Sequence, residues 1–153
     1  MLDIGSNCGF VSLYTSEFVK SVTGVEINPF LVKISNDTKE FLNIQNVKFV
    51  CSTFEEYNTE EKFDIVYSFA NDSTIDNNTT FNFEEYIQKI LFLLSSGGLL
   101  IFESQALDVL VPSKFQSKLE ILEKYFIISE KRKVSSEYPT NVPERIFLVL
   151  EKK

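Results

Sequence analysis

The feature of this 153-residue chain that most constrains its fold is a regular alternation of two hydrophobic patterns. Short, nearly continuous apolar runs, such as "VTGVEI" and "FDIVYSFA", have the length and composition of buried strands. The stretches between them carry apolar residues every three or four positions, which is the spacing of helices. Strands that alternate with helices form a parallel sheet covered by helices. The pattern therefore predicts an α/β fold.

The expected elements follow one another in the order βαβαβ(α)βαβαββ. Strands are expected at residues 2–4, 22–27, 47–51, 63–70, 99–103, 126–134 and 146–150. Helices are expected at 10–20, from Pro29 to Leu42, weakly at 54–57, from a capping box at Asn82 to Gly97-Gly98, and from a second box at Ser113 to Phe126. No helix separates the last two strands, so we expect them to pair antiparallel. The prediction is one domain, residues 1–153, built as a three-layer sandwich around a mostly parallel seven-stranded sheet with an antiparallel last strand.

The opening stretch "LDIGSNCGF" joins a strand to a helix through a turn that follows Asp3 and contains Gly5 and Gly9. Glycines in such a turn remove the Cβ atoms that would keep a ligand away from the backbone. Glu26, at the end of the second strand, stands where dinucleotide-binding folds place an acid on the ribose hydroxyls. The stretch lacks the middle glycine on which a bound diphosphate rests. It therefore favours a nucleoside ligand without a diphosphate over NAD.

The composition of the chain narrows its partners and its location. The formal net charge of −7 disfavours a broad surface for nucleic acids. No apolar run reaches the length of a membrane span, and the start lacks the pattern of a secretory signal. The two cysteines, Cys8 and Cys51, have neither metal-ligand spacing nor a disulfide framework, so we expect a cytoplasmic protein.

Five stretches of the sequence resemble the signature motifs of class I S-adenosylmethionine-dependent methyltransferases. They are "LDIGSNCG", "GVEINP", "FDIVYSFA", "LLSSGGLLIFES" and "ERIFLVLEKK". The resemblance runs over residues 1–150, with the motifs in the order and at the spacing of that family. It implies a Rossmann-like fold, S-adenosylmethionine as the cofactor, and methyl transfer as the reaction.

The resemblance assigns the cofactor to three of these motifs and to the stretch after the third strand. The implied cofactor-binding residues are Asp3, Gly5, Ser6, Asn7, Gly9, Glu26, Ile27, Thr53, Phe54, Ser68 and Phe69. The turn after the first strand would wrap the methionine part, with Asp3 orienting the turn, and Glu26 would bind the ribose hydroxyls. Ile27 would pack on the adenine, residues 53–54 would lie near its amino group, and residues 68–70 would pass beneath the reactive methyl.

The polar run "NDSTIDNNTT", residues 71–80, follows the fourth strand at the end where open α/β sheets bind ligands. We expect it to face the same crevice as the opening turn, and its first residues, Asn71 and Asp72, are the candidate catalytic residues. The chain has no histidine, so the commonest general base is missing. We therefore expect an acceptor that is already nucleophilic, such as a carboxylate, a neutral amine or an acidic hydroxyl, with Asp72 as the base where one is needed. The Asn-Pro-Pro-Tyr type of motif that marks family members acting on amides and bases is absent.

Alternatives to a small-molecule methyltransferase stay open. The chain is also compatible with a nucleoside-binding module that has lost the chemistry and with an NAD-dependent oxidoreductase. "LDIGSNCGF" and "LLIFESQ" also resemble enzymes that methylate RNA 5′ phosphates, an acceptor that the acidic composition disfavours. The family's helices before the first motif are missing, so we expect residues 71–80, an upstream segment or a partner chain to cover the cofactor. The predicted partner is a small-molecule methyl acceptor, with no nucleic acid and no membrane.

Overall fold

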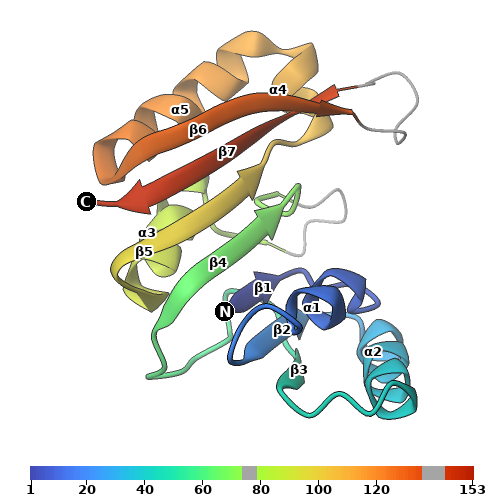
Figure 1. Ribbon diagram of the computed structural model, residues 1–153. Helices are drawn as coiled ribbons and strands as arrows, with labels where there is room; N and C mark the ends of the chain where they lie inside the picture. The colour runs from blue at the N-terminus through green and yellow to red at the C-terminus, as the bar shows by residue number, and fades with distance from the viewer. Residues whose placement is uncertain (74–78, 136–143) are drawn as a thin grey trace. The chain divides into compact units, whose positions relative to one another are not determined.

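The computed structural model describes residues 1–73, 79–135 and 144–153. The chain divides into two compact units, residues 1–60 and 61–153, each with its own strands and helices (Figure 1). Part of the expected loop 71–80, and most of the turn-rich stretch that follows residue 135, lie outside the described residues. That the two units form one domain stays a prediction.

The first unit is a small parallel sheet with two helices. Its elements are β1 (Leu2–Ile4), α1 (Phe10–Thr15), β2 (Val22–Glu26), α2 (Pro29–Phe41) and β3 (Val47–Cys51). The strands lie in the order β3-β2-β1, and all three are parallel. The register pairs Ile4 with Val25 and Glu26 with Cys51. The turn after β1 and the ends of β2 and β3 therefore lie at one edge of this sheet.

Helix α1 is shorter than expected and packs through a different side chain. It ends at Thr15 rather than at residue 20. The aromatic residues whose spacing predicts the helix are largely exposed: Phe10, Tyr14 and Phe18. Leu13 enters the core of the unit instead, where it packs with Val22 and Val47. The apolar spacing thus predicts the helix correctly but not the face that packs.

Helix α2 begins as the sequence predicts. The side chain of Asn28 accepts a hydrogen bond from the backbone N–H of Phe30 at 3.0 Å, and Pro29 occupies the first helical position. A proline suits that position because the missing N–H has no partner within the helix there. The cap fixes where the chain turns from the end of β2 into α2.

The described residues of the second unit, 61–73, 79–135 and 144–153, form four strands and three helices. Its elements are β4 (Phe63–Phe69), α3 (Phe83–Leu93), β5 (Leu94–Glu103), α4 (Ala106–Leu110), α5 (Pro112–Tyr125), β6 (Phe126–Ser135) and β7 (Glu144–Lys152). The strands lie in the order β4-β5-β7-β6. β4 and β5 are parallel, and β7 is antiparallel to both of its neighbours, which confirms the predicted antiparallel last strand.

Helix α3 confirms the predicted capping box and corrects the predicted end. The N–H of Glu85 donates to Asn82 Oδ1, and the N–H of Asn82 donates to Glu85 Oε2. The helix ends at Leu93, so the expected stop at Gly97-Gly98 is wrong. Leu94 is already extended and pairs with Phe63 of β4, so the chain enters the sheet before it reaches the glycines.

Two other expectations about helices are corrected, and one short helix was not expected. The short helix expected at 54–57 is a single turn, closed by the N–H of Tyr57 and the carbonyl of Thr53. The box expected at Ser113 is wrong, because α5 begins one residue earlier, at Pro112, without a side-chain cap. The five-residue helix α4 was not expected, since one turn and a half is too short to show a period. Within the described ranges, no helix combines the length and the apolar character needed to cross a membrane.

Candidate functional site

The turn after β1 is built from residues in the left-handed backbone region. Gly5 has a φ of 67°, Asn7 of 50° and Gly9 of 79°. Glycine and asparagine adopt this conformation at the least cost, which explains their positions in the turn. At Gly9 a side chain is also excluded by space, because an added Cβ would lie 2.6 Å from the ring of Phe49 and 2.9 Å from Ser35 Oγ.

Every backbone N–H of residues 5–9 donates a hydrogen bond inside the first unit. The N–H groups of Gly5 and Ser6 both donate to the carbonyl of Val25, and that of Gly9 donates to the carbonyl of Ser6. The N–H of Asn7 donates to Glu26 Oε2, and the N–H of residue 8 donates to Asn7 Oδ1. The donors of this turn are therefore already used in holding its shape.

Glu26 ties the turn to the start of α2. Its Oε2 accepts from the N–H of Asn7 at 3.0 Å, and its Oε1 accepts from the N–H of Asn28 at 2.9 Å. The residue is 9% exposed. Because each carboxylate oxygen has two lone pairs, each retains one acceptor direction beyond these bonds. The carboxylate can thus hold the backbone and accept from two further hydroxyl groups.

Asp3 is buried beneath the turn rather than presented to solvent. It is 3% exposed, and the hydroxyl of Ser12 donates to its Oδ2 at 2.6 Å. Burial raises the pKa of Asp3 to about 6; the bond from Ser12 opposes this rise, and the negative charge of Glu26 adds to it. The contact with Ser12 fixes the first turn of α1 against β1.

The other predicted cofactor residues of the first unit lie near the same edge of its sheet. Ser6 is buried, whereas Ile27, directly after β2, is 41% exposed. Thr53 and Phe54 follow β3 in the turn that replaces the expected helix. The hydroxyl of Thr53 accepts from the N–H of Glu56, so it is occupied within that turn. The structure thus brings Asn7 and Glu26 into contact and leaves the alkyl side chain of Ile27 partly exposed.

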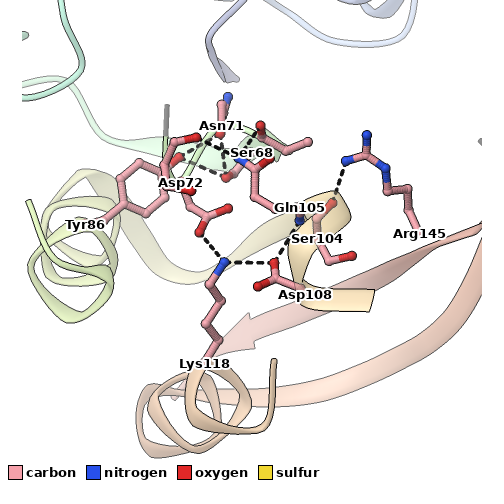
Figure 2. Close-up of polar contacts among 11 residues, drawn as sticks. Ser68, Asn71, Asp72, Tyr86, Ser104, Gln105, Asp108, Lys118 and Arg145 are labelled. Atoms are coloured by element: carbon pink, nitrogen blue, oxygen red, sulfur yellow. Dashed lines mark hydrogen bonds and ion pairs between the residues drawn. The ribbon is translucent and has the colours of Figure 1, made fainter. Parts of the chain in front are cut away.

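In the second unit, the structure brings together two predicted residues at the end of β4 and one that the sequence did not single out (Figure 2). The hydroxyls of Ser68 and Tyr86 both donate to Asn71 Oδ1, each at 2.9 Å. Ser68 Oγ also lies 2.9 Å from the Tyr86 hydroxyl. Tyr86 is fully buried in α3, and burial raises the pKa of its phenol, so this side chain stays protonated and can donate. Phe69 points elsewhere, with its ring 5.0 Å from that of Tyr67.

Asp72, the residue after Asn71, joins a buried ion pair. Lys118 Nζ on α5 lies 2.6 Å from Asp72 Oδ2 and 2.8 Å from Asp108 Oδ2. Both carboxylates are almost completely buried. Burial raises the pKa of Asp72, and the charge of Lys118 opposes that rise. Asp72, the candidate base, is therefore held by the ammonium group of Lys118, which is 46 positions away in the sequence.

Further functional candidates in the second unit were missed by the sequence or given little weight. Tyr86 lies on the apolar face of α3, where the spacing of apolar residues indicates core packing. A buried tyrosine hydroxyl needs a partner, and that requirement is the signal that would have found it. Gln105, two residues after β5, donates through Nε2 to the carbonyls of Ala70 and Ser73. Lys118 gave no local signal because both of its partners are remote in sequence.

A second polar group in this unit surrounds the start of β7. Arg145 Nη1 donates to the carbonyl of Ser104 at 3.0 Å and lies 3.9 Å from Glu103 Oε1. Partial burial raises the pKa of Glu103, and the charge of Arg145 opposes it. These contacts tie the end of β5 to β7 beside the segment that carries Gln105.

Known proteins resemble this chain in sequence. The family model of the methyltransferase domain matches residues 1–142. The release factor glutamine methyltransferase of Fusobacterium nucleatum is 35% identical over 71 residues. That match covers 44% of this chain and 20% of the relative, so the chain spans about a fifth of the length of this curated protein.

Solved structures share the fold over almost the whole chain. An S-adenosylmethionine-dependent methyltransferase from Methanosarcina mazei has a TM-score of 0.79 at 16% identity, with 99% of this chain and 91% of that one covered. The N-methyltransferase NodS from Bradyrhizobium japonicum WM9, in complex with S-adenosyl-L-homocysteine, has a TM-score of 0.77 at 14% identity, with 99% and 76% covered. These likenesses confirm the predicted Rossmann-like α/β fold.

Proposed function

Because the chain belongs to the methyltransferase domain family, we propose that it transfers a methyl group from S-adenosylmethionine to a small-molecule acceptor by in-line displacement. The first unit holds the cofactor, and the residues after β4 meet the acceptor. Cys8 and Cys51 are both free thiols. Since reduced thiols are usual in the cytoplasm, we place the protein there.

The observation that carries this proposal is the hydrogen bonding of the turn after β1. A dinucleotide diphosphate binds through backbone N–H groups that point at its oxygens. Here the N–H groups of residues 5–9 all donate within the unit. The carbonyls of Ser6, Asn7 and Gly9 already accept hydrogen bonds. Each carbonyl oxygen has a second lone pair, so the turn can still accept hydrogen bonds although its N–H donors are used. It therefore suits the ammonium group of a methionine moiety better than a diphosphate.

The acids of the first unit fit the rest of this cofactor. Glu26 retains one acceptor direction on each carboxylate oxygen, which matches the two hydroxyls of a ribose. Ile27 offers an exposed alkyl surface for the adenine. Asp3, buried behind the turn, acts by fixing α1 through Ser12. The cofactor itself supplies the reactive sulfonium methyl, and the protein supplies position and electrostatics.

The chemistry at the end of β4 favours an acceptor that needs no strong base. The chain has no histidine. Asp72 is paired with Lys118, and its carboxylate is almost completely buried. We propose Asn71 as the residue that meets the acceptor, and a base role for Asp72 stays a prediction. An acceptor with a carboxylate, a neutral amine or an acidic hydroxyl fits this arrangement.

A calorimetric titration tests the cofactor. We expect S-adenosylhomocysteine to bind to the purified chain and NAD not to bind. Binding of NAD alone, or of neither ligand, would contradict the proposal.

A pair of glycine variants tests whether the turn is the binding element. We expect Gly5→Val to remove binding of S-adenosylhomocysteine while the circular dichroism spectrum is retained. Gly97→Val is the matched control, because Gly97 also has a positive φ of 68° and an added Cβ there meets nothing within 4 Å. Full affinity in a folded Gly5→Val protein would show that the turn serves structure alone.

A non-catalytic nucleoside-binding module is the second candidate, and turnover separates it from the first. The chain would be incubated with S-adenosylmethionine labelled on its methyl group and a panel of small carboxylic acids, amines and phenols. Transfer of label to any of them excludes the module. Binding without transfer to any acceptor, including a 5′-phosphorylated RNA, supports it.

A further inference from the structure

The segment that follows β4 has an unusual backbone conformation. Ala70 has a φ of 53°, in the left-handed region that residues with a Cβ rarely adopt. Such conformations persist only where the surrounding structure holds them, and they cluster at functional sites. Residues 70–72 therefore need an external restraint, and the structure shows where it comes from.

One restraint is a closed circuit of polar contacts that returns to its starting point (Figure 2). Gln105 Nε2 donates to the carbonyl of Ala70, and the N–H of Gln105 donates to Asp108 Oδ2. The same Asp108 oxygen accepts from Lys118 Nζ, which also donates to Asp72 Oδ2. Asp72 lies two residues after Ala70, so the circuit closes on the segment itself. Lys118 is the cation that joins its two carboxylates.

The second restraint is the pair of hydroxyls on Asn71. Tyr86 from α3 and Ser68 from β4 both donate to Asn71 Oδ1. An amide oxygen that accepts from two donors fixes which way the amide group faces. Residues from four elements, β4, α3, α4 and α5, thus determine the geometry of residues 70–72.

We propose that Lys118 and Tyr86 are positioning residues for methyl transfer, which act through residues 70–72 on the acceptor and not on the cofactor. This inference rests on the proposed function, because it takes Asn71 as the residue that meets the acceptor. Lys118 holds the strained backbone of the segment, and Tyr86 sets the orientation of the Asn71 amide. Neither side chain touches the acceptor.

Two variants and two matched controls test the proposal. Tyr86→Phe removes one buried hydroxyl and keeps the ring, so it retains the packing of α3. Tyr125→Phe is its control, since the Tyr125 hydroxyl bonds to Glu84, away from the segment. Lys118→Met removes the cation from the circuit, and Lys118→Arg restores the charge. Lys124→Met is the control on the same helix, since Lys124 is exposed and pairs with Glu84, away from the segment.

The first readout is the split between kcat and cofactor affinity, measured with the acceptor that takes label in the panel described above. We expect Tyr86→Phe and Lys118→Met to lower kcat by about 10- to 100-fold, because small displacements of a reacting group have effects of that size. The dissociation constant for S-adenosylhomocysteine should stay within about twofold of that of the unmodified chain, a smaller change than the loss of one hydrogen bond produces. Lys118→Arg should recover part of kcat. An unchanged kcat in Tyr86→Phe, or an equal loss in the control variants, would overturn the proposal.

The second readout needs no acceptor and is independent of the proposed function. The N–H of Ala70 donates to the carbonyl of Glu103 at 3.0 Å, so its hydrogen exchange reports on the segment. We expect faster exchange at Ala70 in Tyr86→Phe and Lys118→Met than in Tyr125→Phe and Lys124→Met. If S-adenosylhomocysteine fails to bind the unmodified chain, the proposed function fails while this measurement still decides whether the segment is held. Unchanged exchange in both variants would overturn the inference. If Lys118→Met does not fold, Tyr86→Phe decides alone.

Discussion

The two units hold their buried carboxylates in opposite ways. In the first unit, Glu26 accepts from two backbone N–H groups, and Asp3 accepts from a serine hydroxyl. In the second, Asp72 and Asp108 share the ammonium group of Lys118. Backbone donors are fixed by the path of the chain, whereas a lysine reaches its partners through a flexible stem. The Glu26 carboxylate is therefore held by the path of the backbone, which brings together positions 19 apart, and the Asp72–Asp108 pair is held by a packed side chain.

Because of this difference, different substitutions should disrupt the carboxylates of the two units. A backbone-held acid keeps its donors under any side-chain change, but it depends on the glycines and caps that shape the turn. A buried ion pair depends on both partners, since removing one leaves an uncompensated charge. Substitutions in the two units should thus fail for different reasons. Four groups of substitutions test this, from the largest effect to the smallest: at Gly9 and Gly97, at Asp3, at Glu26, and at the caps Asn28 and Asn82.

Gly9→Val should have the largest effect, on the stability of the first unit. A branched side chain at a φ of 79° is strained, and its Cβ would meet the ring of Phe49 at 2.6 Å. Strain and overpacking together lower the free energy of unfolding by roughly 2–6 kcal/mol. Urea unfolding followed by circular dichroism measures the change.

Gly97→Val separates the cost of the strained backbone from the cost of overpacking. Its φ is also positive, but nothing lies within 4 Å of an added Cβ, so only the backbone term of about 1–3 kcal/mol remains. Equal losses in the two variants would show that the contact with Phe49 relaxes without cost.

Asp3→Asn should raise stability at neutral pH, because the charged form of Asp3 is unfavourable in the native state. Its pKa is 3.8 unfolded and about 6 folded, so the native protein binds more protons between these values. The stability that protonated Asp3 contributes is therefore present below pH 4 and is lost as the pH rises through 6. The gap between the two pKa values corresponds to roughly 3 kcal/mol at pH 7.

The asparagine keeps an acceptor for the hydroxyl of Ser12 and carries no charge at any pH. Unfolding free energies at pH 4 and pH 7 should thus converge in Asp3→Asn relative to the unmodified protein. Asp64→Asn is the matched control, because Asp64 is exposed and accepts from the hydroxyl of Ser95. If the free energy of unfolding of Asp3→Asn changed between pH 4 and pH 7 as much as that of the unmodified protein, the carboxylate of Asp3 would be better solvated than the structure shows.

The contrast between the units also explains how much the sequence could predict. The order of the strands, the cap at Asn28, the box at Asn82 and the turn after β1 all depend on residues close together in sequence. Each of these was predicted, because capping and left-handed turns have local signatures. Helix ends were less accurate: Leu94 leaves α3 early because it pairs with β4, a tertiary contact.

The contacts of the second unit were out of reach for the same reason. Lys118 is 46 positions from Asp72, and Gln105 is 35 positions from Ala70. A lysine on an amphipathic helix reads as a solvated charge unless its buried partners are known. The sequence correctly placed Asn71 and Asp72 directly after the carboxyl end of β4. It could not show that their side chains bond to different partners.

Variants of Glu26 should have an intermediate effect, on ligand affinity. Glu26→Ala removes the acceptor for the ribose hydroxyls and for the N–H groups of Asn7 and Asn28. Hydrogen bonds to a charged group contribute about 1.5–3 kcal/mol each, so affinity for S-adenosylhomocysteine should fall by at least about tenfold. Calorimetric titration measures the loss.

Glu26→Gln sharpens this test. A glutamine keeps one acceptor oxygen, but its NH₂ group then faces one of the two backbone N–H donors. It should therefore lose more affinity than a simple count of ribose contacts suggests, and its turn should exchange amide hydrogens faster. Affinity equal to that of the unmodified protein would show that the carboxylate serves the backbone only.

The smallest effects are expected at the two asparagine caps, which form a matched pair across the units. Asn28→Ala and Asn82→Ala each remove a side-chain acceptor from a helix N-terminus, and each should lower the free energy of unfolding by about 1 kcal/mol. Serine at either position should recover most of the loss, since it caps almost as well. The two variants should differ in function: Asn28 also donates its N–H to Glu26, so fraying of α2 disturbs the acid proposed to hold the ribose. We therefore expect a small loss of affinity for S-adenosylhomocysteine in Asn28→Ala and none in Asn82→Ala. A loss of affinity in Asn82→Ala but not in Asn28→Ala would indicate that S-adenosylhomocysteine does not bind at the end of β2.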